Sequence, residues 1–349
     1  MNFLELFQDK IFLILGGTGS IGSEIVSQLL NYNPKTIRIL SNSEDELWKT
    51  KLRFQKYDDK LRYLLGDIRN YERLERATED VNFVFNTAAI KHVPISEYNP
   101  MEAINVNIHG LENIVEASIS CGVDKLIHIS SDKAVNPTTV MGATKMLGER
   151  LCVSRELAKG EHSTIISCVR FGNVLGSRGS IIPLIKNQIR NGNNVTLTDE
   201  KMRRFFLSLS QAVKLVLKAA LLAKGGEIFV LKMPVILIKD LIEVMIEEYA
   251  PKIGKEPSLI KIETIGVRPG EKFHEELISP IEFSVCKEID DMYCIYPLIN
   301  FDQTVEVYSM SLNGSEVLID EKNFHYSTEN VNTLTKDQIK KLLKEINLI

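Results

Sequence analysis

The first half of the chain alternates between short apolar runs and longer segments whose apolar residues recur at helical spacing. In residues 23–32, Ile25, Leu29 and Leu30 are separated by polar residues, which predicts a helix. The apolar runs predict buried strands at residues 10–15, 36–40, 61–65, 81–86 and 124–129. Apolar strands separated by helices indicate a parallel sheet covered on both faces. We therefore expect an α/β fold with a doubly wound parallel sheet.

After Arg170 the alternation becomes irregular. A glycine-rich loop leads into a helical pattern, and the apolar runs near 195–208 and 226–234 alternate with further helical segments. We expect residues 1–170 to form a dinucleotide-binding domain, to which the chain returns at about 205–232. Residues 171–300 are expected to form mostly a smaller C-terminal substrate lobe, and residues 301–349 a tail that ends in a helix. The apolar N-terminus predicts a short docking helix.

Composition narrows the class of protein. The 349 residues are 44% apolar and 25% charged, as in ordinary globular proteins, and carry a formal net charge of −4. This charge gives no reason to expect nucleic acid or an anionic membrane as a partner. No apolar run reaches the roughly 18 residues that span a bilayer, and five scattered cysteines argue against a disulfide framework or a zinc site. We therefore expect a cytoplasmic protein with no membrane segment.

A glycine-rich turn joins the first predicted strand to the first predicted helix. Glycines allow a tight turn and close backbone approach, so that the helix N-terminus can hold a pyrophosphate. The spacing is similar to the short-chain dehydrogenase/reductase variant of the Rossmann dinucleotide fingerprint. We assign cofactor contacts to Gly16, Thr18, Gly19, Ser20, Ile21 and Gly22.

The ends of the next two strands concern the adenosine part of such a cofactor. Ser41 and Asn42 stand where an acid would bind the ribose of NAD and an arginine would accept the 2′-phosphate of NADP. Neither is present, so NAD and NADP both stay open, and Glu44 fits a helix start as well as a ribose contact. Asp67, followed by Ile68, either accepts from the adenine amino group or caps the next helix.

Further cofactor contacts are expected after the fourth strand. Ala88 and Ala89 let a dinucleotide pass close to the backbone. Lys91, assigned to both cofactor and substrate, is alternatively a surface residue. Asn107 lies within a helix expected over about residues 101–121, where it is either polar filler or a support for an active-site lysine.

Polar residues crowd the end of the fifth strand, where Ser131, Asp132 and Lys133 follow one another. Consecutive residues on an extended strand alternate sides, so only a bent strand end aims several of them at one ligand. Lys145 lies one helical turn after Met141 on the same face. Short-chain dehydrogenases carry a tyrosine at the position of Met141, and its phenolate removes a substrate proton while the lysine holds the nicotinamide ribose. Methionine cannot do this, so alone it argues for lost activity.

Several long motifs resemble those of nucleotide-diphospho-N-acetylglucosamine 4,6-dehydratases, which belong to the extended short-chain dehydrogenase/reductase superfamily and act in polysaccharide biosynthesis. They run in the same order from about Lys10 to Ile278, and more loosely through FHYSTEN. Some members of this family carry methionine at the position of Met141. The motifs are AAIKHVPISEYNP, SSDKAVNPTTVMGATK, RFGNVLGSRGSIIPL, TDEKMRRFF, GEIFVLKMP and IGVRPGEKFHEEL.

The resemblance implies a reaction with NAD or NADP, tightly bound and recycled: oxidation at sugar C4, loss of water across C5 and C6, and return of hydride to C6. It implies that Asp132 is the acid at the C6 hydroxyl and Lys133 the base at C5, with Ser131 hydrogen-bonded to the C4 oxygen. A base lysine must be neutral, so we expect burial and the nearby Lys145 to lower the pKa of Lys133. The C4 proton is expected to leave through Asp132 or a water held by Ser131.

The resemblance also implies a sugar-nucleotide site in the second lobe. Backbone N–H groups ahead of a helix suit a diphosphate, arginines add charge-assisted contacts, and Glu271 accepts from ribose hydroxyls. Which of Arg203 and Arg204 turns inward is open. We assign substrate contacts to Lys91, Asn173, Ser177, Arg178, Gly179, Ser180, Thr198, Arg204, Arg268 and Glu271.

We predict a lyase that converts UDP-N-acetylglucosamine to a UDP-2-acetamido-2,6-dideoxy-4-keto-hexose by oxidation at C4, elimination of water across C5 and C6, and return of hydride to C6.

 The alternatives are a UDP-N-acetylhexosamine 4-epimerase and the same dehydration on a GDP-linked sugar. An epimerase needs the C4 ketone but no base at C5, so the pair Asp132 and Lys133 argues against it. A dinucleotide-binding protein without activity would have no reason to keep Ser131, Asp132, Lys133 and Lys145 together. The expected partner is a UDP-sugar, and we expect a homo-oligomer.

Overall fold

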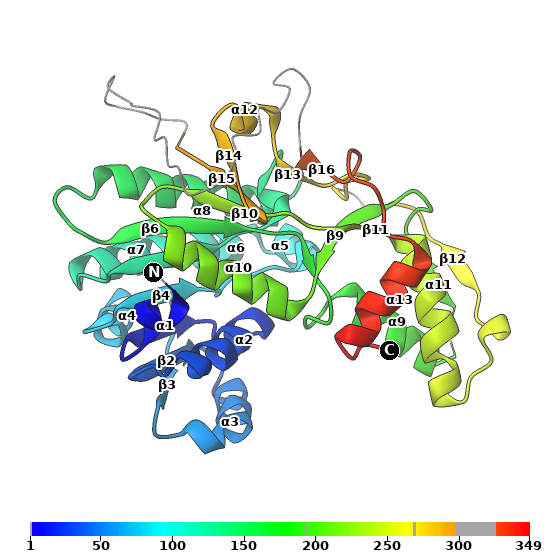
Figure 1. Cartoon of the computed structure of the whole chain (residues 1–349), viewed down its shortest axis with the longest axis horizontal. Coiled ribbons are helices and arrows are strands. Elements are labelled where there is room, and N and C mark those ends of the chain that lie inside the picture. The colour runs from blue at the N-terminus through cyan, green and yellow to red at the C-terminus, as the bar shows by residue number, and fades with distance from the viewer. Residues whose placement is uncertain (1, 193, 268–269, 298–325) are drawn as a thin grey trace.

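A nine-stranded sheet forms the centre of the larger lobe in the structure, a computed structural model that describes residues 2–192, 194–267, 270–297 and 326–349 (Figure 1). The strand order reverses at β1, which lies between β2 and β4, and ligands of doubly wound sheets bind at this reversal. In spatial order the parallel strands are β3 (Leu61–Leu65), β2 (Thr36–Ser41), β1 (Ile11–Leu15), β4 (Phe83–Asn86), β5 (Lys125–Ile129), β6 (Ile165–Arg170) and β10 (Ile228–Leu231).

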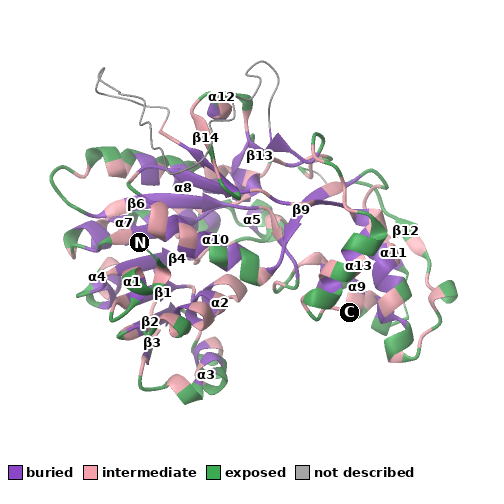
Figure 2. Ribbon diagram, in the orientation of Figure 1, coloured by how far each residue is buried: buried purple, intermediate pink, exposed green. Residues whose placement is uncertain are grey.

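Helices cover both faces of this sheet, because each connection between parallel strands crosses over one face. On one side α2 (Ser20–Leu29) packs against α10 (Leu209–Leu222), and α3 (Glu44–Arg53) packs on β2 and β3. On the other side lie α4 (Tyr71–Thr78), α7 (Gly110–Ser120) and α8 (Val140–Ala158). Figure 2 shows the strands buried between these layers. The predicted doubly wound α/β fold is confirmed.

The expected long helix near residues 101–121 is built from three consecutive pieces. α6 (Pro100–Ile104) continues through a π-helical turn at Asn105–His109 into α7. A shorter helix, α5 (Val93–Tyr98), precedes it and packs against α8. The π-helical turn carries Asn107, whose side chain therefore points toward the strand ends rather than into solvent.

A smaller lobe has its own apolar core, which includes Ile185, Leu241 and Leu343. These residues come from three helices, α9 (Ile181–Arg190), α11 (Ile238–Tyr249) and α13 (Lys336–Glu345), which lie together in Figure 1. The lobe also contains short strands that connect it to the larger lobe. They are β7 (Asn173–Val174), β8 (Val195–Leu197), β9 (Arg203–Leu207), β11 (Val235–Leu237) and β12 (Ile262–Thr264).

The chain returns to the large sheet more often than the sequence indicates. α10 and β10 return as expected, but β14 (Cys286–Ile289) and β15 (Met292–Ile295) also join it, antiparallel to β10. Between the lobes, β13 (Glu276–Ile278) pairs with β16 (Tyr326–Ser327), and α12 (Pro280–Phe283) follows β13. Part of the expected tail, residues 301–325, lies outside the described residues.

The expected N-terminal docking helix is present as α1 (Phe3–Phe7). The ring of Phe7 is fully buried and packs edge-on against Phe12 of β1 and Phe83 of β4. Across the described ranges, we find no helix with the length and apolar character needed to cross a membrane.

Candidate functional site

A cavity of about 900 Å³ lies at the carboxyl ends of the central strands, where the strand order reverses. Its volume is in the range of pockets that bind small molecules and cofactors. Asn107, Thr198, Arg204 and Glu271 lie outside its lining, and Arg268 lies outside the described residues. The predicted residues that line the cavity are Gly16, Thr18, Gly19, Ser20, Ile21, Gly22, Ser41, Asn42, Asp67, Ile68, Ala88, Ala89, Lys91, Ser131, Asp132, Lys133, Met141, Lys145, Asn173, Ser177, Arg178, Gly179 and Ser180.

The glycine-rich turn after β1 is packed too closely for side chains. Gly16 adopts a positive φ of 71°, and a Cβ atom there would lie 2.8 Å from the backbone nitrogen of Ala88. A Cβ atom on Gly22 would lie 2.6 Å from the carbonyl oxygen of Gly16. The turn therefore presents bare backbone at the start of α2, as a bound pyrophosphate requires.

The part of the cavity that is expected to hold adenosine has neutral side chains at the end of β2 and a charged side chain after β3. The hydroxyl of Thr18 donates to that of Ser41 at 3.1 Å, whereas Glu44 begins α3 and lies outside the lining. Asp67 does not cap α4, because Asn70 does so. Instead Asp67 pairs with Arg69 at 2.7 Å, and this hydrogen-bonded pair lowers the pKa of Asp67.

Asn107 is buried and holds two segments of the site together. Its side chain accepts a hydrogen bond from the backbone nitrogen of Ile90 at 2.8 Å and donates to the hydroxyl of Thr144 at 2.9 Å. It therefore supports the loop before Lys91 and the residue next to Lys145, and it does so without contacting the cavity itself. The reading of Asn107 as polar filler is wrong.

Met141 and Lys145 lie on one face of α8 and both line the cavity. Met141 is only 4% exposed. The ammonium of Lys145 donates to the carbonyl oxygen of Ile129 at 2.8 Å, and burial lowers the pKa of Lys145 to about 8. Lys145 is thus a cation that loses its proton unusually easily.

The chain bends at the end of β5, so that Asp132 and Lys133 enter a short 3₁₀ turn. The ammonium of Lys133 lies 3.1 Å from the carboxylate of Asp132, which also accepts from the hydroxyl of Ser131 at 2.6 Å. Burial alone would raise the pKa of Asp132, but Lys133 and the surrounding hydrogen bonds hold it below its usual range.

The expected lowering of the Lys133 pKa is wrong for this state of the protein. Burial alone would lower it, but the carboxylates of Asp132 and Glu275 outweigh burial and raise the pKa of Lys133 above its usual value. Lys145 is not among the groups that shift it. Lys133 is therefore held as a cation between two acids.

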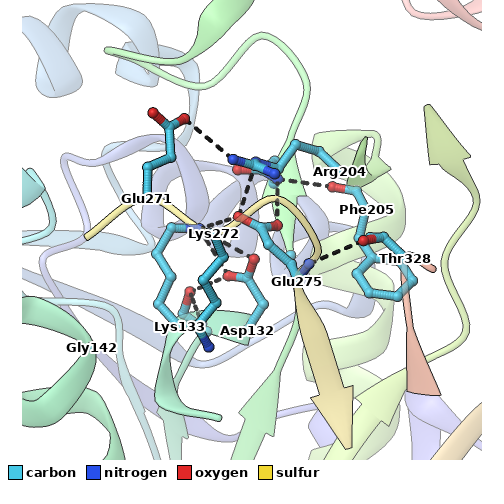
Figure 3. Close-up of polar contacts among 12 residues, drawn as sticks. Asp132, Lys133, Gly142, Arg204, Phe205, Glu271, Lys272, Glu275 and Thr328 are labelled. Carbon is cyan, nitrogen blue, oxygen red and sulfur yellow. Dashed lines mark hydrogen bonds and ion pairs between the residues drawn. The ribbon is translucent and has the colours of Figure 1, made fainter. Parts of the chain in front are cut away.

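Glu275 is the main site residue that the sequence did not reveal. It is 6% exposed, and its carboxylate lies 3.2 Å from the ammonium of Lys133 and 3.1 Å from the guanidinium of Arg204 (Figure 3). The sequence signal for an inward-facing Glu275 is its position two residues before the buried Leu277, because residues two apart share one face of a strand. Glu276 follows it directly, and only the fold shows which of the two glutamates turns inward.

Arg204, rather than Arg203, turns inward. Its guanidinium contacts Glu271 at 3.2 Å and Glu275 (Figure 3). It also donates to the carbonyl oxygen of Phe273. It therefore balances the charges of Glu271 and Glu275 behind the cavity, and its assignment to the substrate stays a prediction.

The loop before α9 closes over the glycine-rich turn. The backbone nitrogen of Arg178 donates to the hydroxyl of Ser20 at 3.0 Å, and its guanidinium pairs with Glu46 of α3. Lys91 donates to the carbonyl oxygen of Arg178 at 2.7 Å, so Lys91 is no isolated surface residue. Burial, and then the charge of Arg178, lowers the pKa of Lys91.

Comparison with known proteins identifies the family. The model of the polysaccharide biosynthesis protein family matches residues 12–297. A UDP-N-acetylglucosamine 4,6-dehydratase (inverting) of Campylobacter jejuni is 40% identical over 98% of both chains. A protein of Methanocaldococcus jannaschii, described as an uncharacterized membrane protein, is 51% identical over 99% of this chain and 98% of its own.

Two further comparisons bear on fold and activity. A UDP-glucose 4-epimerase of Rickettsia canadensis is 36% identical over 99% of this chain and 98% of its own. The solved structure of Pen from Bacillus thuringiensis is 43% identical, with a TM-score of 0.89 over 98% of this chain and 99% of that one. The resemblance to 4,6-dehydratases is confirmed, and the chain belongs to the polysaccharide biosynthesis protein family.

Proposed function

We propose that the chain is a sugar-nucleotide 4,6-dehydratase that converts UDP-N-acetylglucosamine to UDP-2-acetamido-2,6-dideoxy-4-keto-hexose. The observation that carries this proposal is the pair of Asp132 and Lys133, which faces the cavity beside Lys145. Elimination of water needs an acid and a base close together, and this pair provides one of each. Met141 excludes the alternative in which a tyrosine at that position handles the proton.

The glycine-rich turn and the small residues after β4 would hold NAD or NADP. The fit rests on the bare backbone at Gly16 and Gly22, which leaves room for a pyrophosphate at the start of α2. When bound, the dinucleotide supplies the removal of hydride from C4 and its return to C6. Lys145, which also lines the cavity, would hold the nicotinamide ribose.

Asp132 would serve two steps in succession. Because its pKa is lowered, it is ionised at neutral pH and can accept the proton of the C4 hydroxyl while Ser131 orients the C4 oxygen. It would then deliver the same proton to the C6 hydroxyl, which leaves as water. Asp132 thus starts and ends the reaction as a carboxylate, and the proton that it uses comes from the substrate.

Lys133 would remove the proton from C5. Oxidation at C4 makes this C–H bond acidic, because the electron pair left behind is stabilised as an enolate. The base must first lose its own proton, and the proton that it takes from C5 is available for return to C5 after hydride reaches C6. Lys145 takes no part in this step, because its ammonium is hydrogen-bonded to the carbonyl oxygen of Ile129.

The sugar nucleotide would enter along the loop before α9. Ser180 is the N-cap residue of the ten-residue helix α9, but its buried hydroxyl makes no capping hydrogen bond and has no partner among the described residues. A helix N-terminus with a free hydroxyl suits a diphosphate, and Lys91 and Arg178 add positive charge nearby. Contacts from Arg204, Glu271, Thr198 and Arg268 stay predictions, as do the homo-oligomer and the cytoplasmic location.

A 4-epimerase is the second candidate, because relatives named UDP-glucose 4-epimerase are 36% identical to the chain. An epimerase returns hydride to C4 and leaves the substrate mass unchanged. The test is to incubate the protein with UDP-N-acetylglucosamine and follow the mass of the sugar nucleotide. We expect the loss of one water, whereas a product of unchanged mass would overturn the dehydratase proposal.

A further inference from the structure

Glu275 contacts Lys133 but does not line the cavity. Hydrogen bonds of its backbone hold it in place. Its backbone nitrogen donates to the hydroxyl of Thr328 at 3.0 Å, and its carbonyl oxygen accepts from the backbone nitrogen of Thr328 at 2.9 Å. The next residues form β13, which pairs with β16. The backbone at Glu275 is therefore held in place independently of the charge of its side chain.

The carboxyl group contacts polar groups from three elements, two of them charged. Oε1 lies 3.2 Å from the ammonium of Lys133 and 3.1 Å from Nε of Arg204, and Oε2 accepts from the amide of Asn173 at 3.2 Å. The charge of Asp132 also acts on this carboxyl group. Lys272, on the same connection as Glu275, adds a more distant positive charge.

Two neighbouring buried carboxyl groups disfavour each other's ionised form. Burial, and then the charge of Asp132, raises the pKa of Glu275 to about 7, although Lys133 and Arg204 oppose this shift. The pKa of Asp132 is held low, so Asp132 stays ionised, and Glu275 is the acid whose protonation changes near neutral pH. Glu275 can therefore take up or release a proton at neutral pH, directly beside an amine that must lose one.

We propose that Glu275 accepts the proton of Lys133 when ligands fill the cavity, and so converts Lys133 into the neutral base of the elimination. This inference rests on the proposed dehydratase function and adds a residue that acts through Lys133. An N–H bond of Lys133 breaks and an O–H bond forms on Glu275, with no change in total charge. Lys133 then takes the C5 proton, and the electron pair of the C–H bond stays on the sugar as the enolate.

The transfer is favoured by the exclusion of water. A buried ion pair loses its hydration when ligands close the cavity, whereas two neutral groups lose much less. Asp132 stays ionised during the transfer and remains free to accept the C4 proton. Below about pH 7, Glu275 already carries a proton and cannot accept another, so the elimination should weaken as the pH falls through this value.

The test compares Glu275→Gln with Glu275→Asp and with the neighbouring Glu276→Gln. Glutamine keeps the shape but cannot accept a proton, while aspartate can. Glu276 contacts Asn136 rather than Lys133, so Glu276→Gln is a matched control for changing a glutamate at this point of the chain. Thermal unfolding of each variant confirms that it folds.

For Glu275→Gln we expect exchange of the C5 hydrogen with deuterated solvent to fall by about 10²–10⁴-fold, the usual contribution of a positioned proton-transfer group. Reduction of the bound nicotinamide by the substrate should persist. The acid limb of the rate, near pH 7 in the wild type, should disappear in Glu275→Gln and remain in Glu275→Asp and Glu276→Gln. Wild-type C5 exchange with an unchanged acid limb in Glu275→Gln would overturn the inference.

A second measurement separates this inference from the proposed function. Infrared difference spectra of the substrate-free protein, wild type against Glu275→Gln, should show a carboxyl group that titrates near pH 7. Its absence would overturn the role of Glu275 even if the enzyme is a dehydratase. Its presence in a protein that leaves UDP-N-acetylglucosamine unchanged would instead refute the proposed function.

Discussion

Replacement of Lys145 by methionine is expected to stabilise the protein while removing its activity. Lys145 is 8% exposed, and within the described part of the chain its ammonium donates only to the carbonyl oxygen of Ile129. Burial without a carboxylate contact makes the charged form costly, and this lowers the pKa of Lys145 to about 8. Methionine has a similar length and no charge, so it removes that cost.

The magnitude follows from the shift in pKa. A lowering from 10.5 to about 8 corresponds to about 3 kcal/mol at about 1.4 kcal/mol for each pKa unit. The native state disfavours the proton, so this destabilisation is fully present below about pH 8 and disappears as the pH rises toward 10.5. The lost hydrogen bond to Ile129 offsets about 1 kcal/mol of the gain.

The assay is urea unfolding of the nucleotide-free protein at pH 7 and at pH 10. We expect Lys145→Met to be more stable than the wild type by about 2 kcal/mol at pH 7, and this advantage to fall by about 2 kcal/mol at pH 10. Lys35→Met, which removes an exposed lysine, is the control and should change stability by less than about 0.5 kcal/mol. An advantage that does not change with pH would refute the reasoning.

Three further variants test separate parts of the account. Lys133→Ala should still reduce the bound nicotinamide but should not release water, and normal dehydration by this variant would exclude Lys133 as the base. Met141→Leu should keep most of the activity because the side chain only packs, so a loss of more than about 100-fold, or about 2.7 kcal/mol, in a folded variant would contradict that role. Arg170→Met should cost roughly 3–5 kcal/mol in urea unfolding, because the fully buried guanidinium pairs with both Glu149 and Glu282; a cost below about 1 kcal/mol would contradict this.

The sequence predicted the parts of the fold that depend on local pattern. The strands and helices of the first half appear close to their expected positions, because continuous apolar runs and helical spacing are local properties. The antiparallel strands β14 and β15 were not predicted, because Cys286–Ile289 is short, half-buried and lacks a strong apolar pattern. Their place in the sheet depends on β10, which lies more than fifty residues away in the chain.

Sequence motifs predicted the location of the site. The interactions between its charged side chains could not be predicted. The glycine turn and the cluster at Asp132 lie where the strand ends place them. The protonation of Lys133 was mispredicted, because it depends on Glu275, which is distant in sequence and whose inward orientation follows from the pairing of β13 with β16. The ion pairs of Arg204 with Glu271 and Glu275 were not predicted for the same reason, because these residues come together only in the fold.

The most direct test of the central claim is proton NMR of the product formed from UDP-N-acetylglucosamine in deuterium oxide. The account predicts a 4-keto sugar nucleotide with a C6 methyl group and deuterium at C5, because the C5 proton is removed and replaced. A product that retains its C6 hydroxyl and its original C5 hydrogen, with the configuration changed only at C4, would contradict the assignment of Asp132 and Lys133 to elimination.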